Sequence, residues 1–206
     1  MSELVDRINA VRREVVTTAI GGHEGKAVIL RRRYDSPAAD VWNACTSPER
    51  LARWLAPVSG ELRLGGAYEL EGNARGEVLA CQEPTLLRVS WIYGEEIPGT
   101  PAPEVTLRLP PDGDGATLLE LEHVAVVDPE FWDRYGPGAV GVGWDLALIG
   151  LEAHLGGTEA KEEREFILGS AERWRAAHEA SGADAAEAER SAANTAAFYA
   201  PEPQES

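Results

Sequence analysis

Cysteine, long apolar runs and basic residues are all scarce in this sequence. Its 206 residues include two cysteines, Cys45 and Cys81, which lie far apart in apolar surroundings, so we expect buried thiols and no disulfide framework. No window approaches the roughly 18 uninterrupted apolar residues of a membrane span. Residues 1–7 contain no apolar segment of the kind found in signal peptides. These absences favour a cytoplasmic protein.

Basic residues are outnumbered, with 19 Lys and Arg against 35 Asp and Glu and a net charge of −16 at pH 7. Such an acidic surface repels phosphate backbones and anionic lipids, so we expect neither nucleic acid nor a membrane as a partner. The one basic cluster is Arg31-Arg32-Arg33, where Arg32 points away from its neighbours if the segment is a strand. We interpret these arginines as solvated, although one of them could neutralise an acidic ligand.

Motifs for metal, nucleotide and nucleophile chemistry are missing as well. The four histidines show no His-x-x-x-His step, and there is no Cys-x-x-Cys. Gly25-Lys26 lacks the rest of a phosphate loop, and Gly141-x-Gly143 lacks the third glycine of a dinucleotide site. No Gly-x-Ser-x-Gly elbow is present. We therefore expect no metal and no cofactor, and no motif fixes a catalytic residue.

What is present is a clear change of hydrophobic periodicity along the chain. Apolar residues at helical spacing, beginning with Leu4, predict a helical arm over residues 1–23. β-Forming residues predict a strand over 26–34. Ser36-Pro37 and Ser47-Pro48 then each open a short helix, because serine caps a helix N-terminus and proline fits its first turn.

The pattern changes to strands in the middle of the chain and returns to helices at its end. Six strands in hairpin order are expected between residues 60 and 126, with Leu62 and Leu64 in the first of them. Residues 127–139 are expected to be an irregular loop. Apolar residues at three- and four-residue steps predict a long helix over 140–155, and two further helices are expected over 158–180 and 183–199.

This order predicts an α+β fold in which an antiparallel sheet wraps around the long helix. The motifs resemble the SRPBCC (START-like, birch-pollen-allergen-like) superfamily, and most of all its branch related to the C-terminal domain of the activator of heat-shock protein 90 ATPase. The resemblance rests on the runs Asp35-Ser36-Pro37-Ala38-Ala39-Asp40-Val41-Trp42 and Ser47-Pro48-Glu49-Arg50-Leu51-Ala52-Arg53-Trp54, on Gly65-Gly66-Ala67-Tyr68 and Gly76-Glu77-Val78, and on Leu87-Arg88-Val89-Ser90-Trp91 and Gly143-Trp144.

The resemblance implies a helix-grip fold with an internal pocket between the sheet and the last core helix. We expect this domain to span residues 24–156, between the helical arm of residues 1–23 and a helical extension over 157–200. Residues 201–206 are expected to be a disordered tail. The extension lies outside the family core, and we interpret it as packing on the domain or mediating self-association.

Aromatic side chains and a few polar ones are the candidates for the pocket. Any single ring is more simply explained as core, but as a group they favour a pocket in this fold. His123 follows Leu119 and Leu121 in phase, so it faces inward as a polar contact or a hydrogen-bonded core residue. Asp145 could cap or pair locally. The candidate ligand-binding residues are Trp54, Tyr68, Glu77, Trp91, Tyr93, His123, Trp132, Trp144 and Leu148.

Three functions remain open at this point. The first is binding of a small hydrophobic or amphipathic molecule, neutral or cationic because the body is acidic. The second, implied by the resemblance alone, is a co-chaperone that stimulates a heat-shock ATPase. The third is an enzyme like the polyketide cyclases and aromatases of the superfamily, with His123 moving protons, and it ranks below binding because no acid–base pair is fixed by spacing.

Overall fold

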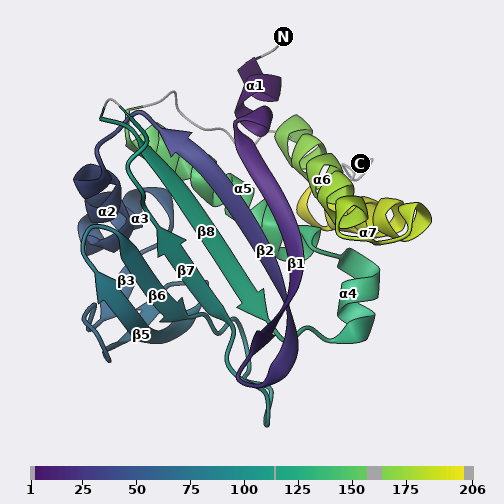
Figure 1. The fold of residues 1–206 in the computed structure, drawn as a ribbon, viewed down its shortest axis with the longest axis horizontal. Helices are drawn as coiled ribbons and strands as arrows, with labels where there is room; N and C mark the ends of the chain where they lie inside the picture. Colours follow the sequence, from purple (N-terminus) through teal and green to yellow (C-terminus); the bar gives the residue numbers. More distant parts are fainter. Residues whose placement is uncertain (1–2, 114, 157–163, 202–206) are drawn as a thin grey trace, which may run out of the picture.

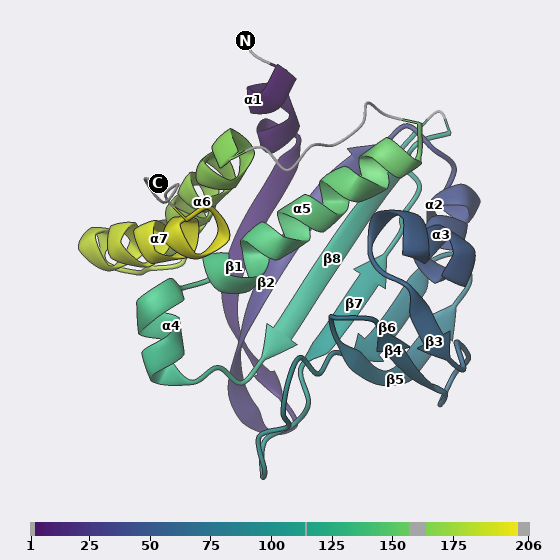
Figure 2. The same ribbon diagram turned by 180° about the vertical axis from the view of Figure 1, so that it is seen from behind.

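The computed structural model describes residues 3–113, 115–156 and 164–201, and its centre is one curved antiparallel sheet (Figures 1 and 2). The described residues form eight strands in the order β1-β2-β8-β7-β6-β5-β4-β3, so β1 and β3 are the two edges. The strands are β1 (Val11–Ile20), β2 (His23–Tyr34), β3 (Val58–Gly60), β4 (Ala67–Leu70), β5 (Arg75–Gln82), β6 (Leu86–Ser90), β7 (Glu104–Arg108) and β8 (Thr117–Ala125).

One face of the sheet is covered by the long helix α5, which crosses it diagonally (Figure 2). Helices α2 and α3 lie beside the C-terminal end of α5, and α6 and α7 lie on the far side of the edge strand β1 (Figure 2). This is the helix-grip arrangement that the sequence predicts. The helices are α1 (Glu3–Asn9), α2 (Ala38–Thr46), α3 (Pro48–Trp54), α4 (Pro129–Tyr135), α5 (Gly138–His154), α6 (Arg164–Ala180) and α7 (Ala185–Tyr199).

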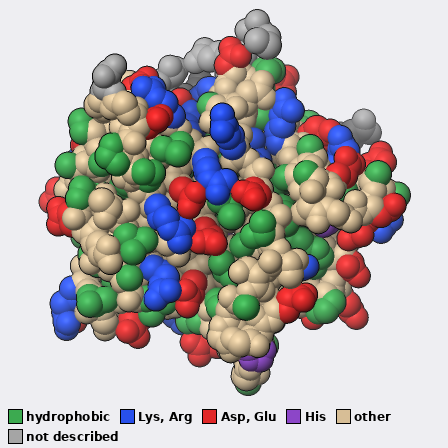
Figure 3. Space-filling view, in the orientation of Figure 1, with side chains coloured by type: hydrophobic (Ala, Val, Ile, Leu, Met, Phe, Trp, Pro, Cys, Tyr) green, Lys and Arg blue, Asp and Glu red, His purple; other side chains and the backbone are tan. Residues whose placement is uncertain are grey.

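Alternation along β8 shows why one face of the sheet receives α5 and the other meets solvent. Leu119 and Leu121 are buried on the α5 side, whereas Glu120 between them points outward, as a two-residue period requires. Glu120 accepts hydrogen bonds from Arg31 Nε at 2.6 Å and from Arg108 Nη1 at 3.1 Å. Arginine and glutamate side chains accordingly lie next to one another across the outer face of the sheet (Figure 3).

The N-terminal arm is only partly helical, which corrects the sequence prediction for residues 1–23. Helix α1 ends at Asn9, and Val11–Ile20 is an edge strand that pairs with β2 along its whole length. Val11 and Val15 are buried, and a spacing of four fits a two-residue period as well as a helical turn. The β-branched run Val15-Val16-Thr17-Thr18 favours the strand.

Three further predictions are wrong in detail. Cys81 is exposed on β5 and is not a buried thiol. Residues 127–139 are not an irregular loop, because Asp128 caps the short helix α4 by accepting a hydrogen bond from the Phe131 backbone N–H, and Pro129 fits its first turn. Leu62 and Leu64 are exposed in the connection after β3 and are not part of a strand.

The two predicted C-terminal helices are confirmed as α6 and α7 where the structure describes them. Residues 158–163 of the first prediction lie outside the described residues, as do residues 1–2 and 202–206 of the expected arm and tail. Ile167 and Trp174 of α6 and Val11 of β1 belong to the same core cluster as the sheet. Among the described helices, none is long and apolar enough to cross a membrane. The expected division into arm, domain and extension stays a prediction.

Candidate functional site: an apolar pocket under helix α5

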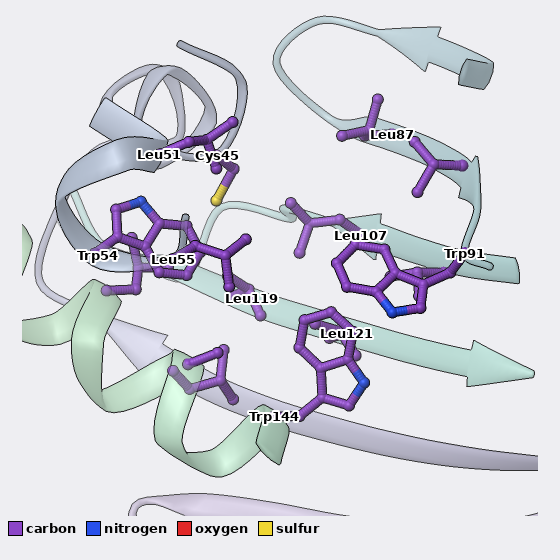
Figure 4. Close-up of a pocket in the computed structure, with 15 residues that line it drawn as sticks. Cys45, Leu51, Trp54, Leu55, Leu87, Trp91, Leu107, Leu119, Leu121 and Trp144 are labelled. Carbon is purple, nitrogen blue, oxygen red and sulfur yellow. The ribbon is translucent and has the colours of Figure 1, made fainter. Parts of the chain in front are cut away.

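A pocket with a volume of about 90 Å³ lies between α5, the sheet and the pair α2–α3 (Figure 4). Every residue that lines it has an apolar or sulfur-containing side chain. We call it the α5 pocket and define it by Cys45, Leu51, Trp54, Leu55, Leu87, Val89, Trp91, Val105, Leu107, Leu119, Leu121, Trp144, Ala147, Leu148 and Leu151.

Two periodicities bring these residues together. On α5, Trp144, Ala147 and Leu151 recur every three or four residues and therefore lie along one side of the helix. On β6, β7 and β8 the lining residues recur every second position, as in Leu119 and Leu121, so each strand turns one row of side chains toward α5. The pocket thus follows from a helical face set against a pleated face.

The indole N–H groups at two walls of the pocket are already hydrogen-bonded within the protein. Trp144 Nε1 donates to His123 Nδ1 at 3.1 Å, and Trp54 Nε1 donates to the Ala44 carbonyl at 3.0 Å. The Trp91 and Trp144 rings pack against each other with centroids 5.0 Å apart. Neither hydrogen-bonded indole has a second N–H to offer a ligand.

The two titratable groups nearest the pocket are both uncharged at neutral pH. Burial raises the pKa of the Cys45 thiol to about 12. Burial also lowers the pKa of His123 to about 4, because the charged imidazolium would lose its hydration. His123 Nδ1 accepts the Trp144 hydrogen bond, so this nitrogen is not free to take a proton from a ligand.

The structure brings four of the nine predicted site residues together in the pocket: Trp54, Trp91, Trp144 and Leu148. His123 lies directly behind Trp144 and supports its ring. The other four predicted residues lie elsewhere.

Each of these four has a different environment. Tyr68 is buried, and its hydroxyl donates to the Ser90 carbonyl at 2.7 Å. Glu77 is exposed on β5, and Tyr93 is 74% exposed beyond the end of β6. Trp132 lies on α4 against His178, with ring centroids 5.4 Å apart.

Sequence reasoning missed the aliphatic part of the lining, which includes Leu51, Leu87 and Leu107. The hydrophobic periodicity of the sequence does point to them. Each lies in a predicted element, in phase with a predicted aromatic residue or with another buried leucine. Of the aliphatic lining residues, only Leu148 is among the predicted site residues.

A curved antiparallel sheet that holds a long helix over an apolar pocket defines a protein of the helix-grip class. The sequence matches the family described as Activator of Hsp90 ATPase homolog 1-like protein over residues 35–156, and the chain belongs to this family. No curated protein matches the sequence.

Solved structures extend the similarity beyond the family region. The crystal structure of CalU16 from Micromonospora echinospora is 38% identical, with a TM-score of 0.68, over 82% of this chain and 98% of CalU16. EF2215 from Enterococcus faecalis has a TM-score of 0.60 at 14% identity over 82% of this chain and 91% of its own. MLL2253 from Mesorhizobium loti has a TM-score of 0.54 at 23% identity, over 65% of this chain and 99% of its own. The last two show the fold alone.

Proposed function

We propose that this protein binds a small, uncharged hydrophobic molecule, or the apolar part of a larger amphipathic one, in the α5 pocket. The observation that carries the proposal is the lining, which has no charged side chain and whose Trp54 and Trp144 N–H groups are hydrogen-bonded within the protein. A polar ligand atom placed beside Trp54 or Trp144 would lose its hydration without gaining a partner from these rings, at a cost of about 1–3 kcal/mol.

The volume limits how much of a ligand is enclosed. At about 90 Å³ the pocket is smaller than the engineered cavity of about 150 Å³ that takes up benzene, and far smaller than sites of about 300–1,000 Å³ for drug-sized molecules. The enclosed part is therefore a short alkyl chain or one small ring. The rest of a larger ligand stays outside the pocket.

Thermal unfolding with simple probes tests the proposal. We expect butylbenzene and octan-1-ol to raise the Tm and the charged octanoate to raise it less. A neutral probe at 100 times its Kd adds about 2.7 kcal/mol, or roughly 5–10 °C for a chain of this size. Unchanged Tm values with all of the neutral probes would contradict the proposal.

A matched pair of variants tests whether the probes bind in the α5 pocket. Ala147→Leu extends a side chain that lines the pocket, whereas Ala153→Leu makes the same change on α5 outside the lining. We expect Ala147→Leu to abolish the Tm shift and Ala153→Leu to retain it. Equal shifts in the two variants would place the probes somewhere else on the protein.

The second candidate function is stimulation of an Hsp90-type ATPase, which the family match over residues 35–156 favours. Its test is the turnover of the chaperone ATPase from the same cell with and without this protein. Unchanged turnover would end this proposal and leave the binding proposal standing.

A further inference from the structure

Two arginines and one glutamate meet at the C-terminal half of α5, away from the α5 pocket. Arg32 Nη2 lies 2.5 Å from Glu152 Oε1, and Arg7 Nε lies 3.1 Å from Glu152 Oε2. Alternation along β2 turns Arg32 to the inner face, so its side chain is only 3% exposed, whereas Arg31 and Arg33 pair with acidic residues on the outer face. We call these three residues the Arg7–Arg32 cluster.

Two N–H donor groups of the cluster are not hydrogen-bonded within the part of the chain that is described. Arg32 Nη1 and Arg7 Nη2 are both buried and have no hydrogen-bond partner among the described residues. A buried donor without a partner is costly, and native structures contain few of them. Because both guanidiniums contact one carboxylate, the unsatisfied N–H groups belong to the same small region.

Among the described residues, the charges at the cluster do not balance either. Arg7 and Arg32 carry two positive charges against the single negative charge of Glu152. The neighbouring pair, Arg13 of β1 with Asp145 of α5, is already matched one to one and offers no compensation. The excess of positive charge around the buried Arg32 side chain favours an anion.

We propose that Arg7 and Arg32 bind a small oxyanion, a carboxylate or a phosphate, with each guanidinium donating an N–H to it. The planar donors of arginine match the oxygens of such anions, and the bonds are strengthened by charge. The side chains of Arg7 and Glu152 are 18% and 30% exposed, so the cluster borders solvent, and an ion that contacts the two buried N–H groups has to displace the Arg7 side chain. This site shares no residue with the α5 pocket and does not depend on ligand binding there.

Thermal unfolding of the full chain in three anions tests the site. Sodium phosphate, sodium acetate and sodium chloride are compared at one pH and equal ionic strength, so that general screening is the same. At ten times its Kd the bound anion raises the Tm by about 3–6 °C over chloride. A shift with acetate assigns a carboxylate. A shift with phosphate alone assigns a phosphate group only where the Arg7→Gln variant described below loses it, because phosphate also stabilises folded proteins by exclusion from their surface. Equal Tm values in the three salts would overturn the proposal, since water would then serve the two donors.

Matched variants locate the effect. Arg7→Gln removes one donor group from the cluster, and Arg12→Gln removes the same charge from an exposed position on β1. We expect Arg7→Gln to lose at least half of the anion-specific shift and Arg12→Gln to keep it. An undiminished shift in Arg7→Gln would overturn the site, because the anion would then bind elsewhere.

Calorimetric titration of the unmodified protein with the active anion gives a second readout if Arg7→Gln unfolds. We expect one binding site per chain. The affinity should be weaker by about tenfold or more in Arg32→Lys, because lysine keeps the positive charge but lacks the forked N–H donors of the guanidinium. Heat no larger than that of chloride at equal ionic strength would overturn the proposal.

Discussion

The two sides of helix α5 lie in opposite environments. Trp144 faces the pocket, where the neighbours are apolar and space remains. Asp145, the next residue, is fully buried on the other side, against β1 and α6. One side is apolar and incompletely filled, whereas the other side, at Asp145, is polar, with the carboxylate hydrogen-bonded by three side chains. The difference separates a surface that can accept a ligand from one that holds the helix in place.

The hydrogen bonds around Asp145 form a network that joins three elements, β1, α5 and α6. Asp145 accepts hydrogen bonds from Arg13 Nε at 2.9 Å and Nη2 at 3.0 Å, from Ser170 Oγ at 2.5 Å, and from Trp174 Nε1 at 3.0 Å. Arg13 also donates to two backbone carbonyls near the start of β1. We call Arg13, Asp145, Ser170 and Trp174 the Asp145 cluster. It ties the edge strand and the first C-terminal helix to the helix that forms the pocket.

Removing one charge from the Asp145 cluster should have the largest effect. Arg13→Met keeps the apolar stem and leaves the Asp145 carboxylate buried without its counter-ion, which costs about 3–5 kcal/mol. Urea unfolding followed by circular dichroism measures the loss. Arg12→Met, an exposed change on the same strand, is the control and should cost less than about 0.5 kcal/mol. A loss below about 1 kcal/mol for Arg13→Met would show that the network contributes little stability.

On the pocket side, we expect His123 to make the free energy of unfolding depend on pH. The pKa of His123 is lowered to about 4 in the folded protein and is about 6.5 when unfolded, so below pH 6.5 the unfolded state takes up the proton first. His123 therefore lowers stability by about 1.4 kcal/mol per pH unit as the pH falls from 6.5 to 4, and it has no such effect above pH 6.5.

His123→Gln isolates this contribution. Unfolding free energies measured from pH 7 to pH 4 should fall less steeply in the variant than in the unmodified protein. His23→Gln, an exposed position, should leave the slope unchanged. Parallel curves for His123→Gln and the unmodified protein would mean that the histidine is not held neutral behind Trp144.

The sequence predicts the pocket side of α5 better than the opposite side. Trp144 and Leu148 recur at helical spacing, and strand alternation at Leu119 and Leu121 supplies the facing wall, so local periodicity is sufficient there. Tyr93 does not line the pocket, because β6 ends at Ser90, the pairing continues only as an isolated bridge at Ile92, and Tyr93 lies beyond it with 74% of its surface exposed.

The Asp145 cluster could not be predicted in the same way. We expected Asp145 to cap or pair locally, and its ionic partner is Arg13, which is 132 residues away in the sequence. Arg13 lies in a segment assigned to a helix, so the prediction placed it on the wrong kind of element. Charge pairing across such distances depends on the tertiary fold, and no single-sequence period reports it.

The smallest expected effect comes from enlarging one residue on each side of α5. At Gly141, on the filled side, an added Cβ would lie 2.2 Å from Cε2 of Trp174, and that ring is fixed by its hydrogen bond to Asp145. Gly141→Ala should therefore cost about 1–3 kcal/mol, even though alanine favours a helix by about 1 kcal/mol over glycine. Ala147→Leu fills space in the pocket and should change stability by less than about 1 kcal/mol while it blocks the probes. Urea unfolding of both variants measures the contrast, and equal losses would show that the two sides of α5 are packed alike and that the pocket is not space a ligand can use.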